Sequence, residues 1–424
     1  MIKNKFYIIL FSFSIVLSQT STISFYGQGE YLNSYNASSI ALGNSKYFGE
    51  SSSGFSVSSP STYFRTSDFI ISTSLKVSKN KISNVEEMMK NNFELFFISF
   101  PISKSKSFSF GMKPIYRSDI EIIEDNYTYI GADELSPLIN ISNNLNLQGP
   151  MRYISSFDFK GGLSELFLVY SSRINDKISL GISYSKMFGT SKYKYSVDLY
   201  SLSYSNTGEL LQTSFSENNY VINTQKYSSS RYLFELRYQF EDMNFVFDYS
   251  ISESLKIRLN EQVHFTTSIF DDTTFEDLGK MEKYGLGLSY NLSNKLVINS
   301  EFRYLDSFKP YDFLNIFSFK NPDIKSLSFG ANYTLNTDSD LYDDLNIKLG
   351  RYSDILSYHN FDVYDRGFTI GFGIEYLEKK NSMNFAFKIG TRKSDHFNFN
   401  DEKYFNFYFT IISSDEWFNN ERNK

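Results

Sequence analysis

Apolar and polar residues alternate with a period of two in many segments of this chain. Residues 178–185 and 284–291 are examples, and residues 366–377 read Arg-Gly-Phe-Thr-Ile-Gly-Phe-Gly-Ile-Glu-Tyr-Leu. A strand turns successive side chains to opposite faces, so each segment is predicted to be a β-strand with one apolar and one polar face. Fourteen strands are predicted, at residues 67–78, 91–101, 106–118, 163–174, 177–189, 229–240, 243–255, 281–292, 295–306, 324–336, 344–352, 366–377, 382–392 and 403–412.

Alternation alone fits either a soluble sandwich, with its apolar faces in the core, or a membrane barrel, with its apolar faces against lipid. The apolar faces begin and end in Tyr and Phe, as the aromatic girdles of a barrel do. Every second connection is short, such as 175–176 and 241–242, whereas others reach about forty residues at 119–162 and 190–228. We therefore predict an all-β, transmembrane antiparallel β-barrel of about 14 strands in the outer membrane of a gram-negative bacterium, with both termini in the periplasm.

The first 66 residues precede the predicted barrel. Residues 1–18 are predicted to be a signal peptide, because Lys3 and Lys5 precede an apolar run from Phe6 to Leu17. The alternative is a membrane anchor, but this run is shorter than the roughly 20 residues that a spanning helix needs. Residues 19–66 would either fill the lumen as a plug or remain a periplasmic arm. The barrel itself is assigned to 67–412 and a periplasmic tail to 413–424.

The composition limits the possible chemistry. The 424 residues include no cysteine, which excludes a disulfide scaffold, a thiol nucleophile and a Cys-ligated metal site. The net charge of −6 argues against nucleic acid as a partner. Asp395-His396 and His359-Asn360 could belong to an outer-membrane hydrolase, but solvated loop residues are the preferred interpretation, as for His264. The acidic run from Asp338 to Asp344 lacks the Gly and Glu of a calcium loop. We expect no enzyme, metal or cofactor.

Charged residues of both signs fall at the inward-facing positions of the predicted strands. They are Lys113, Glu235, Arg237, Asp248, Glu301, Arg303, Lys388 and Arg392. Mixed signs predict ion pairs along the wall or with a plug rather than a selectivity ring of one sign. The same alternation places Tyr232, Phe234, Leu236, Phe368, Ile370 and Phe372 toward lipid. It places Ser183 and Gly371 toward the lumen, where we expect polar substitutions to be tolerated.

Pro114 is the only proline inside a predicted strand, and Gly111 lies three residues before it. A closed barrel has no edge strand, so a missing N–H predicts a bulge or a local break in pairing. The functional interpretation is an opening in the barrel wall; the alternative is a harmless bulge at the rim.

Several motifs resemble those of the outer-membrane long-chain fatty-acid transporters (the FadL/TodX type), and the resemblance spans nearly the whole chain after residue 18. Those motifs are Ser38-Ser-Ile-Ala-Leu-Gly-Asn-Ser45 with Ser59-Pro-Ser61, Phe100-Pro-Ile-Ser-Lys104, Phe110-Gly-Met-Lys-Pro-Ile-Tyr116, Gly161-Gly-Leu-Ser-Glu165, Tyr284-Gly-Leu-Gly-Leu-Ser-Tyr290 and Trp417-Phe418. The resemblance implies a fourteen-stranded barrel, a leader folded into the lumen as a hatch that includes Ser59, Pro60 and Ser61, and a lateral gate at a kink formed by Gly111 and Pro114. The sequence departs from the family pattern at Ser59-Pro-Ser61, where the family has Asn-Pro-Ala.

Two functional hypotheses follow, from different classes. The first is passive uptake of hydrophobic small molecules, long-chain fatty acids or similar, through the hatch and the lateral opening. The alternative is a non-transporting barrel that serves as a protein-secretion partner (PorV type) or a surface adhesin; an outer-membrane hydrolase comes third. The expected partners are outer-membrane lipid and lipopolysaccharide, an apolar small-molecule ligand and the barrel-assembly machinery.

Overall fold

The structure is a computed structural model. It describes residues 21, 23, 27–32, 34–51, 54–66, 68–82, 88–130, 149–204, 207, 210–265, 268–309, 311–313, 317–319, 321–336, 342–358, 360–396 and 401–415. The helical elements are α2 (Ala37–Ile40) and the 3-10 helix η2 (Pro60–Arg65). The strands up to β10 are β1 (Glu30–Tyr31), β2 (Phe69–Ile82), β3 (Met88–Ser103), β4 (Lys106–Ile130), β5 (Gly149–Arg173), β6 (Ile178–Tyr204), β7 (Leu210–Phe240), β8 (Met243–Ser252), β9 (Lys256–Phe265) and β10 (Ser268–Asp277). The remaining strands are β11 (Glu282–Asn291), β12 (Leu296–Asp306), β13 (Tyr311–Phe313), β14 (Phe317–Phe319), β15 (Asp323–Asn336), β16 (Asp344–Ser357), β17 (Asp362–Tyr376), β18 (Asn381–Lys393) and β19 (Glu402–Asp415).

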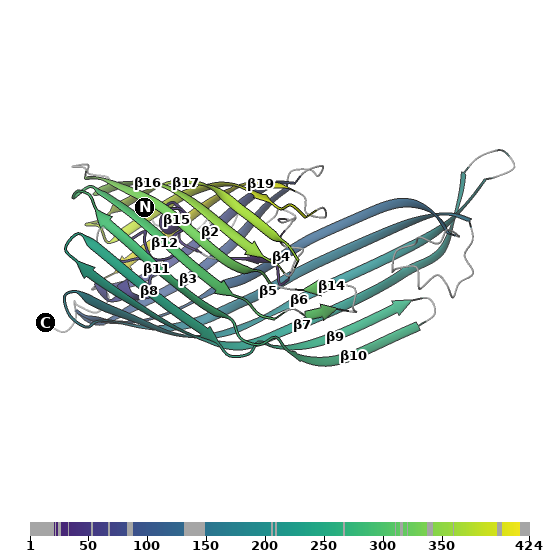
Figure 1. Cartoon of the computed structure of the whole chain (residues 1–424), viewed down its shortest axis with the longest axis horizontal. Coiled ribbons are helices and arrows are strands. Elements are labelled where there is room, and N and C mark those ends of the chain that lie inside the picture. The colour runs from purple at the N-terminus through teal and green to yellow at the C-terminus, as the bar shows by residue number, and fades with distance from the viewer. Residues whose placement is uncertain are drawn as a thin grey trace, which may run out of the picture.

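The strands close into an antiparallel barrel (Figure 1). The main sheet contains 17 strands, and 14 of them form the closed ring once β1, β9 and β10 are set aside. The ring closes where β19 pairs with β2, from Asp415 opposite Phe69 to Glu402 opposite Ile82. The predicted fold class is therefore confirmed, and each predicted strand coincides with one strand of the ring. The barrel extends slightly beyond the predicted bounds, because β19 continues to Asp415.

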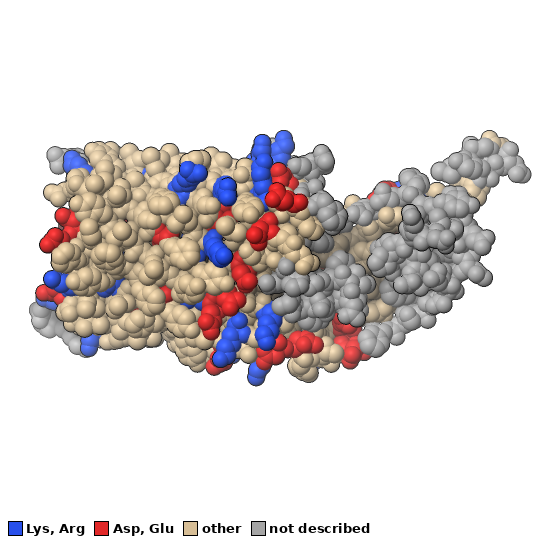
Figure 2. All heavy atoms as spheres, in the orientation of Figure 1, with Lys and Arg blue, Asp and Glu red and all other residues tan. Residues whose placement is uncertain are grey.

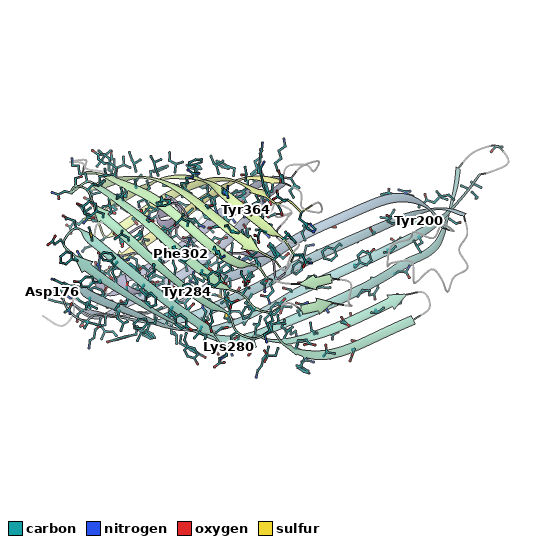
Figure 3. All side chains as sticks on the ribbon, viewed as in Figure 1. Asp176, Tyr200, Lys280, Tyr284, Phe302 and Tyr364 are labelled. Atoms are coloured by element: carbon teal, nitrogen blue, oxygen red, sulfur yellow. The ribbon has the colours of Figure 1, made fainter. Side chains whose placement is uncertain are left out.

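Short turns gather at one end of the barrel. Glu241, in the turn between β7 and β8, has a positive φ of 49°, as a tight two-residue hairpin requires. Figure 3 shows Asp176, in the turn between β5 and β6, at this end, and Tyr200 near the opposite extreme of the molecule. In outer-membrane barrels the short turns are typical of the periplasmic end.

The segments 119–162 and 190–228 are not long loops, and here the sequence-based expectation was wrong. The strands β4 to β7 continue through most of both segments. The hairpin of β9 and β10 lies beside them, with β9 paired to residues 220–228 of β7. Together these strands form a sheet that projects beyond the barrel (Figure 1), which we call the external sheet: residues 117–130, 149–162, 190–204, 210–228 and 256–277. Many of its outward positions are polar, such as Lys192 and Lys194, and exposed apolar residues such as Ile123 and Phe275 are isolated among them. The sheet therefore lacks the regular apolar alternation that marks a lipid-facing strand.

The alternation along the ring is as predicted. Tyr232, Phe234, Phe368, Ile370 and Phe372 point outward and are well exposed, whereas Ser183 is buried on the lumen side. Figure 2 shows a broad band of the barrel that is poor in charged residues and is bounded at both ends by Lys, Arg, Asp and Glu. This band matches the hydrocarbon region of a membrane, with charged groups at its two interfaces.

The two ends of the described chain lie at opposite ends of the barrel. The Ser21 hydroxyl donates to Glu402, at the end of β19 that is remote from the short turns. Asp415, at the other end of β19, pairs with Phe69 near the short turns. The predicted signal peptide, residues 1–18, and most of the tail, residues 416–424, lie outside the described residues. Among the described residues, no helix has the length and apolar character needed to cross a bilayer.

Candidate functional site: the plugged lumen and the seam between β3 and β4

The described residues between Ser21 and Thr66, which we call the leader, lie inside the barrel. Leader residues such as Ile40, Tyr47 and Ser59 are almost fully buried, and they contact inward-facing wall residues. The leader runs from Ser21, at the end of the barrel remote from the short turns, to Arg65, whose guanidinium donates to Gln239 near the short turns. The sequence left a plug and a periplasmic arm open; the described residues of this segment are buried against the inner wall of the barrel.

Charged wall residues hold the middle of the leader mainly through its backbone. The Glu301 carboxylate accepts hydrogen bonds from the backbone N–H groups of Lys46 and Tyr47, at 2.8 and 3.1 Å, and from the Ser45 hydroxyl. The Arg303 guanidinium donates to the carbonyl oxygen of Asn44 at 2.9 Å. Glu301 and Arg303 also form an ion pair with each other, 3.3 Å apart. Both charges are therefore buried with partners, as burial of a charge requires.

A second carboxylate on the wall, Asp248, contacts the same stretch of the leader. It forms an ion pair with the Lys46 ammonium and accepts a hydrogen bond from the Tyr47 hydroxyl. Asp248 is fully buried, and the Lys46 ammonium of the leader is a cation that pairs with it. The leader and the wall are thus joined by side-chain contacts as well as by backbone ones.

The predicted hatch residues lie nearer the short turns, against Glu235 and Arg237 on β7. The Glu235 carboxylate accepts from the backbone N–H of Ser61 at 3.1 Å and from the hydroxyls of Ser59 and Ser61. These donors lie at the start of η2, where free backbone N–H groups favour an anion. The Arg237 guanidinium donates to Ser59 and to the carbonyl oxygen of Tyr47, and pairs with Glu50.

Pro60 packs directly against the wall at Gly181. A Cβ on Gly181 would lie 2.6 Å from atoms of Pro60, so a side chain cannot be added there without moving the leader or the wall. The contact lets η2 approach the inner face of β6. It explains why a lumen-facing glycine stands in an otherwise Ser-rich row of that strand.

At the end of the barrel remote from the short turns, Arg392 is the centre of a buried ion cluster. Its guanidinium contacts Glu30 of the leader and two wall carboxylates, Asp365 at 3.0 Å and Glu402 at 3.1 Å. Burial alone would raise the pKa of Glu30, but Lys76 and Arg392 outweigh that effect and hold the pKa well below its usual range. Lys388 lies nearby, with its ammonium 4.2 Å from the centre of the Tyr352 ring.

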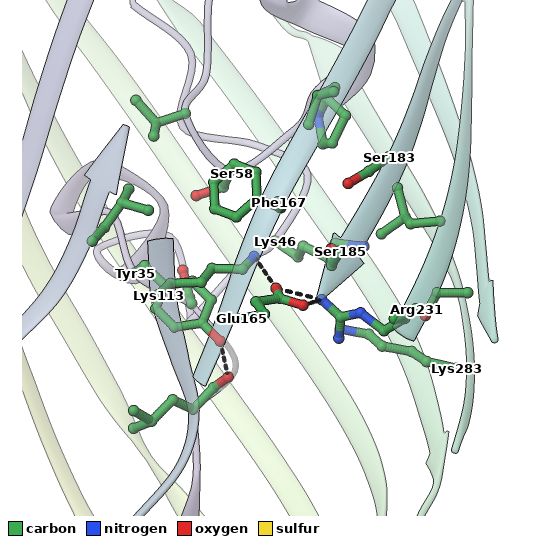
Figure 4. Close-up of a pocket in the computed structure, with 18 of the residues that line it drawn as sticks. Tyr35, Lys46, Ser58, Lys113, Glu165, Phe167, Ser183, Ser185, Arg231 and Lys283 are labelled. Atoms are coloured by element: carbon green, nitrogen blue, oxygen red, sulfur yellow. Dashed lines mark hydrogen bonds and ion pairs between the residues drawn. The ribbon is translucent and has the colours of Figure 1, made fainter. Parts of the chain in front are cut away.

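A small enclosed cavity lies between the leader and the wall (Figure 4). Its volume is about 50 Å³, and the charged residues of its lining are four cations, Lys46, Lys113, Arg231 and Lys283, and one carboxylate, Glu165. The Glu165 carboxylate lies 3.4 Å from the Lys113 ammonium and also pairs with the Arg231 guanidinium. The Lys113 ammonium lies 4.6 Å from the centre of the Tyr35 ring. The site thus combines aromatic surface with an excess of positive charge.

Glu165 and Arg231 were not singled out from the sequence, although a signal was present. Arg231 is separated from Glu235 and Arg237 by an even number of positions, and Glu165 is two positions from buried Phe167, so each points to the same face of its strand as those residues. Counting back along the two strands would have placed both side chains in the lumen. The leader residues Lys46 and Tyr35 carried no comparable signal, because the leader has no regular alternation.

The pairing between β3 and β4 ends early and leaves a seam in the wall. The last pair is Phe96 with Met112, although both strands continue beyond it. The pairing of β4 with β5 shifts register between Pro114 and Tyr116, so a bulge lies at the proline. Gly111 is closely packed just before it, because a Cβ there would lie 2.4 Å from the carbonyl oxygen of Phe96.

The leader occupies this seam. Strand β1 pairs with β4, with Glu30 opposite Arg117 and Tyr31 opposite Tyr116, and the backbone N–H of Leu32 donates to Ile115 at 2.9 Å. Beyond β1, an ion pair of 3.0 Å between Lys90 of β3 and Asp119 of β4 crosses the seam. In this state the backbone of the leader replaces the missing partner strand.

Those candidate hydrolase and metal residues that the structure describes do not assemble a site. His264 stacks on Tyr220 and His396 stacks on Phe361, with ring centres 5.2 and 4.7 Å apart. His359, Asp338 and Asp340 lie outside the described residues. Within the described part of the chain, no group of three or more His, Asp or Glu side chains could hold a metal ion.

Comparisons with known proteins agree with this architecture. The family model named BamG matches residues 1–424. Among solved structures, a FadL homologue from Pseudomonas aeruginosa is similar with a TM-score of 0.56 and 9% identity, covering 92% of this chain and 100% of that one. The CymD monoaromatic hydrocarbon channel gives a TM-score of 0.54 at 10% identity, covering 90% of this chain and 98% of that one. The toluene transporter TodX from P. putida gives 0.51 at 14% identity, covering 91% and 99%. No curated protein matches the sequence.

Proposed function

Because the chain belongs to the BamG family of outer-membrane β-barrels, we propose that it acts as a non-transporting partner subunit in barrel assembly. The family name shares the Bam prefix of the barrel-assembly machinery, which supports that choice of partner. The observation that carries the proposal is the external sheet, which extends strands β4 to β7 far beyond the ring (Figure 1). A channel needs no such projection, whereas a subunit that contacts other proteins needs an accessible surface.

The edges of the external sheet support a role in protein contact. On its outer side, β10 pairs with no strand in the described part of the chain, and residues 271–277 are exposed on both faces. An unpaired strand edge is a template for adding a strand of a partner. Asp271, Asp272, Glu276 and Asp277 make this edge acidic, which disfavours pairing with a second copy of itself and favours a basic partner strand.

The sealed lumen also supports a role other than transport. Wall residues bind the leader at several heights, from Arg392 to Arg237, and the cavity beside Lys113 and Glu165 measures about 50 Å³. Wider pockets of about 490 and 330 Å³ open near the short turns, beside Arg65. Sites for small molecules usually measure about 300–1,000 Å³. A long-chain ligand would therefore need displacement of buried ion pairs before it could enter.

Removing the hairpin of β9 and β10 tests the proposal. Leu255 and Leu278 are already neighbours, since the backbone N–H of Leu278 donates to the carbonyl oxygen of Leu255 at 3.0 Å. Replacing residues 256–277 with a short Gly-Ser turn should thus leave the ring intact, which heat-modifiability in gels would verify. We expect the variant to lose co-purification with the central barrel-assembly β-barrel and to lower the amount of other outer-membrane barrels. Retention of both properties would contradict the proposal.

The second candidate is passive uptake of hydrophobic small molecules, and the seam at Pro114 favours it. Removal of β1 would open the wall between β3 and β4 to lipid, a route that spares an apolar solute contact with water at about 0.8 kcal/mol per CH₂. Pro114→Val restores a backbone donor and favours continuous pairing. Under this candidate the variant assembles normally and takes up a labelled long-chain fatty acid more slowly than the parent. Equal uptake at matched surface abundance would remove the candidate.

A further inference from the structure

The outward face of the barrel carries a basic depression on the side formed by β16 to β19 and β2. It is open, with a volume of about 640 Å³, and its cationic residues are Lys79, Lys81, Arg351, Arg366 and Lys403. Its apolar surface comes from Phe368, Ile389 and Phe405. No acidic residue of the described chain lines it. Figure 2 shows Lys and Arg side chains on the upper part of the barrel, where β2, β17 and β19 are labelled in Figure 1, with Asp and Glu side chains beside them.

The strand register places these residues at the edge of the lipid-facing band. One outward row reads Arg351, Phe368, Ile389, Phe405 and Lys79 across the five strands. The next outward row toward the short turns is apolar, with Ile370, Phe387 and Phe407. The next outward row away from the short turns carries Arg366, Lys403 and Lys81. The cations therefore lie where acyl chains end and head groups of the external leaflet begin.

The arrangement of charge calls for an external anion. Lys403 lies directly opposite Lys81 in the pairing of β19 with β2, and like charges in that position destabilise a sheet. On the external sheet, by contrast, the outward ammonium of Lys160 is paired with Asp158 at 3.1 Å.

Two aromatic contacts orient the arginines. The Arg351 guanidinium lies 5.6 Å from the centre of the Phe368 ring, and that of Arg366 lies 5.2 Å from the centre of the Tyr364 ring. Stacking of this kind holds a guanidinium along the surface while leaving its N–H donors available to phosphate. Figure 3 labels Tyr364, which lies near the start of β17, at the end remote from the short turns.

We propose that this depression binds the phosphorylated head group of a lipid A-type lipid of the external leaflet, with its acyl chains against Phe368, Ile389 and Phe405. Neighbouring strands are about 4.8 Å apart, so the row from β16 to β2 spans about 19 Å. That width suits a head group with two phosphates better than a single phosphate. The site lies on the outer wall and is independent of whether the lumen transports anything.

The test measures binding of bisphosphorylated lipid A to the purified full-length barrel in detergent. We expect Lys81→Gln/Lys403→Gln to bind about thirtyfold more weakly, given the contribution of each cation at an anionic membrane surface. The matched control is Lys104→Gln/Lys295→Gln, which removes two exposed cations at the short-turn end and should bind as the parent does. Because the first variant relieves repulsion, its lipid-free thermal transition should be equal to or higher than that of the parent, which separates lost binding from misfolding.

Two further probes identify the ligand chemistry. Lipid A from which the phosphates have been removed should bind as weakly to the parent as intact lipid A binds to the variant. Inorganic phosphate at millimolar concentration should not displace intact lipid A. Equal binding by parent and variant, equal binding of the dephosphorylated lipid, or displacement by inorganic phosphate would each overturn the proposal.

Discussion

The carboxylate of Glu301 on β12 accepts a hydrogen bond from the backbone N–H of Lys46 in the leader, at 2.8 Å. A wall charge thus binds the main chain of the leader in addition to a side chain, the Ser45 hydroxyl. Glu235 also binds the main chain at Ser61, and Arg303 does so at Asn44. Because backbone groups are present at every position, the leader can depart from a family pattern in its side chains and still be held in the same place.

Replacing Glu301 with Gln tests how strongly the wall holds the leader. Gln keeps the size of the side chain but removes the charge, and it leaves Arg303 buried without its 3.3 Å partner. Loss of one member of a buried pair costs about 3–5 kcal/mol. We expect a lower midpoint in heat-modifiability and more frequent ion-conducting openings in planar bilayers. Ser300→Ala, at the neighbouring outward position on the same strand, is the control and should behave as the parent does.

A glycine-to-alanine pair tests the close contact between leader and wall. A Cβ on Gly350 would lie 1.9 Å from the backbone nitrogen of Gly43, which cannot move without displacing the leader. A Cβ on Gly373 would meet only a side-chain atom, Asn384 Oδ1, at 2.5 Å. Gly350→Ala should therefore destabilise the plugged barrel by about 1–3 kcal/mol, the usual cost of overpacking, and Gly373→Ala by less. Thermal midpoints of the two variants, measured side by side, decide the matter; equal midpoints would contradict the tight contact.

The ring could be predicted from the sequence because lipid imposes an apolar face on every strand that crosses it. Phe368, Ile370 and Phe372 show that requirement directly. The external sheet could not be predicted in the same way, since in water its outward positions are free to be polar, as Lys192 and Lys194 are. A strand without an apolar outward face therefore resembles a loop in its sequence.

The inward orientation of the charged wall residues could be predicted from the alternation along each strand, but their partners in the leader could not. The ligands of Glu301 and Glu235 include backbone N–H groups, which leave no mark in a sequence. Gly371 illustrates the same limit. Alternation marks it as a tolerant lumen position, yet a Cβ there would lie 2.4 Å from the carbonyl oxygen of Phe385 and 2.5 Å from the Cβ of Ala41. The expectation that it tolerates a side chain is wrong, because the backbone of β18 and Ala41 of the leader fill the space in front of it.

A disulfide across the seam tests whether β1 must leave it. The chain has no cysteine, so Tyr31→Cys/Tyr116→Cys creates a single pair at positions directly opposite in the pairing of β1 with β4. Opposed residues of an antiparallel pair have Cα atoms about 4.5–5.5 Å apart, within reach of a disulfide. If the barrel acts in assembly without opening, oxidised and reduced forms should support outer-membrane barrel levels equally. The two single variants, Tyr31→Cys and Tyr116→Cys, control for loss of the ring contact between Tyr31 and Tyr116. Loss of function only in the oxidised form, restored by reductant, would favour movement of the leader.

Two exposed phenylalanines test where the membrane ends. Phe372 points outward within the apolar band and is 38% exposed, whereas Phe275 points outward on β10 of the external sheet and is 76% exposed. An arginine facing the middle of the bilayer costs a transmembrane barrel about 2–4 kcal/mol, and the cost falls to about 0–1 kcal/mol near the interfaces. Phe372→Arg should therefore lower the free energy of unfolding in lipid vesicles by a few kcal/mol, while Phe275→Arg should leave it nearly unchanged, because its side chain is already in water. Urea titration of the two variants in the same vesicles measures the difference. A large loss at Phe275 would mean that the external sheet lies in the membrane, and the assignment of a water-exposed partner surface would fall with it.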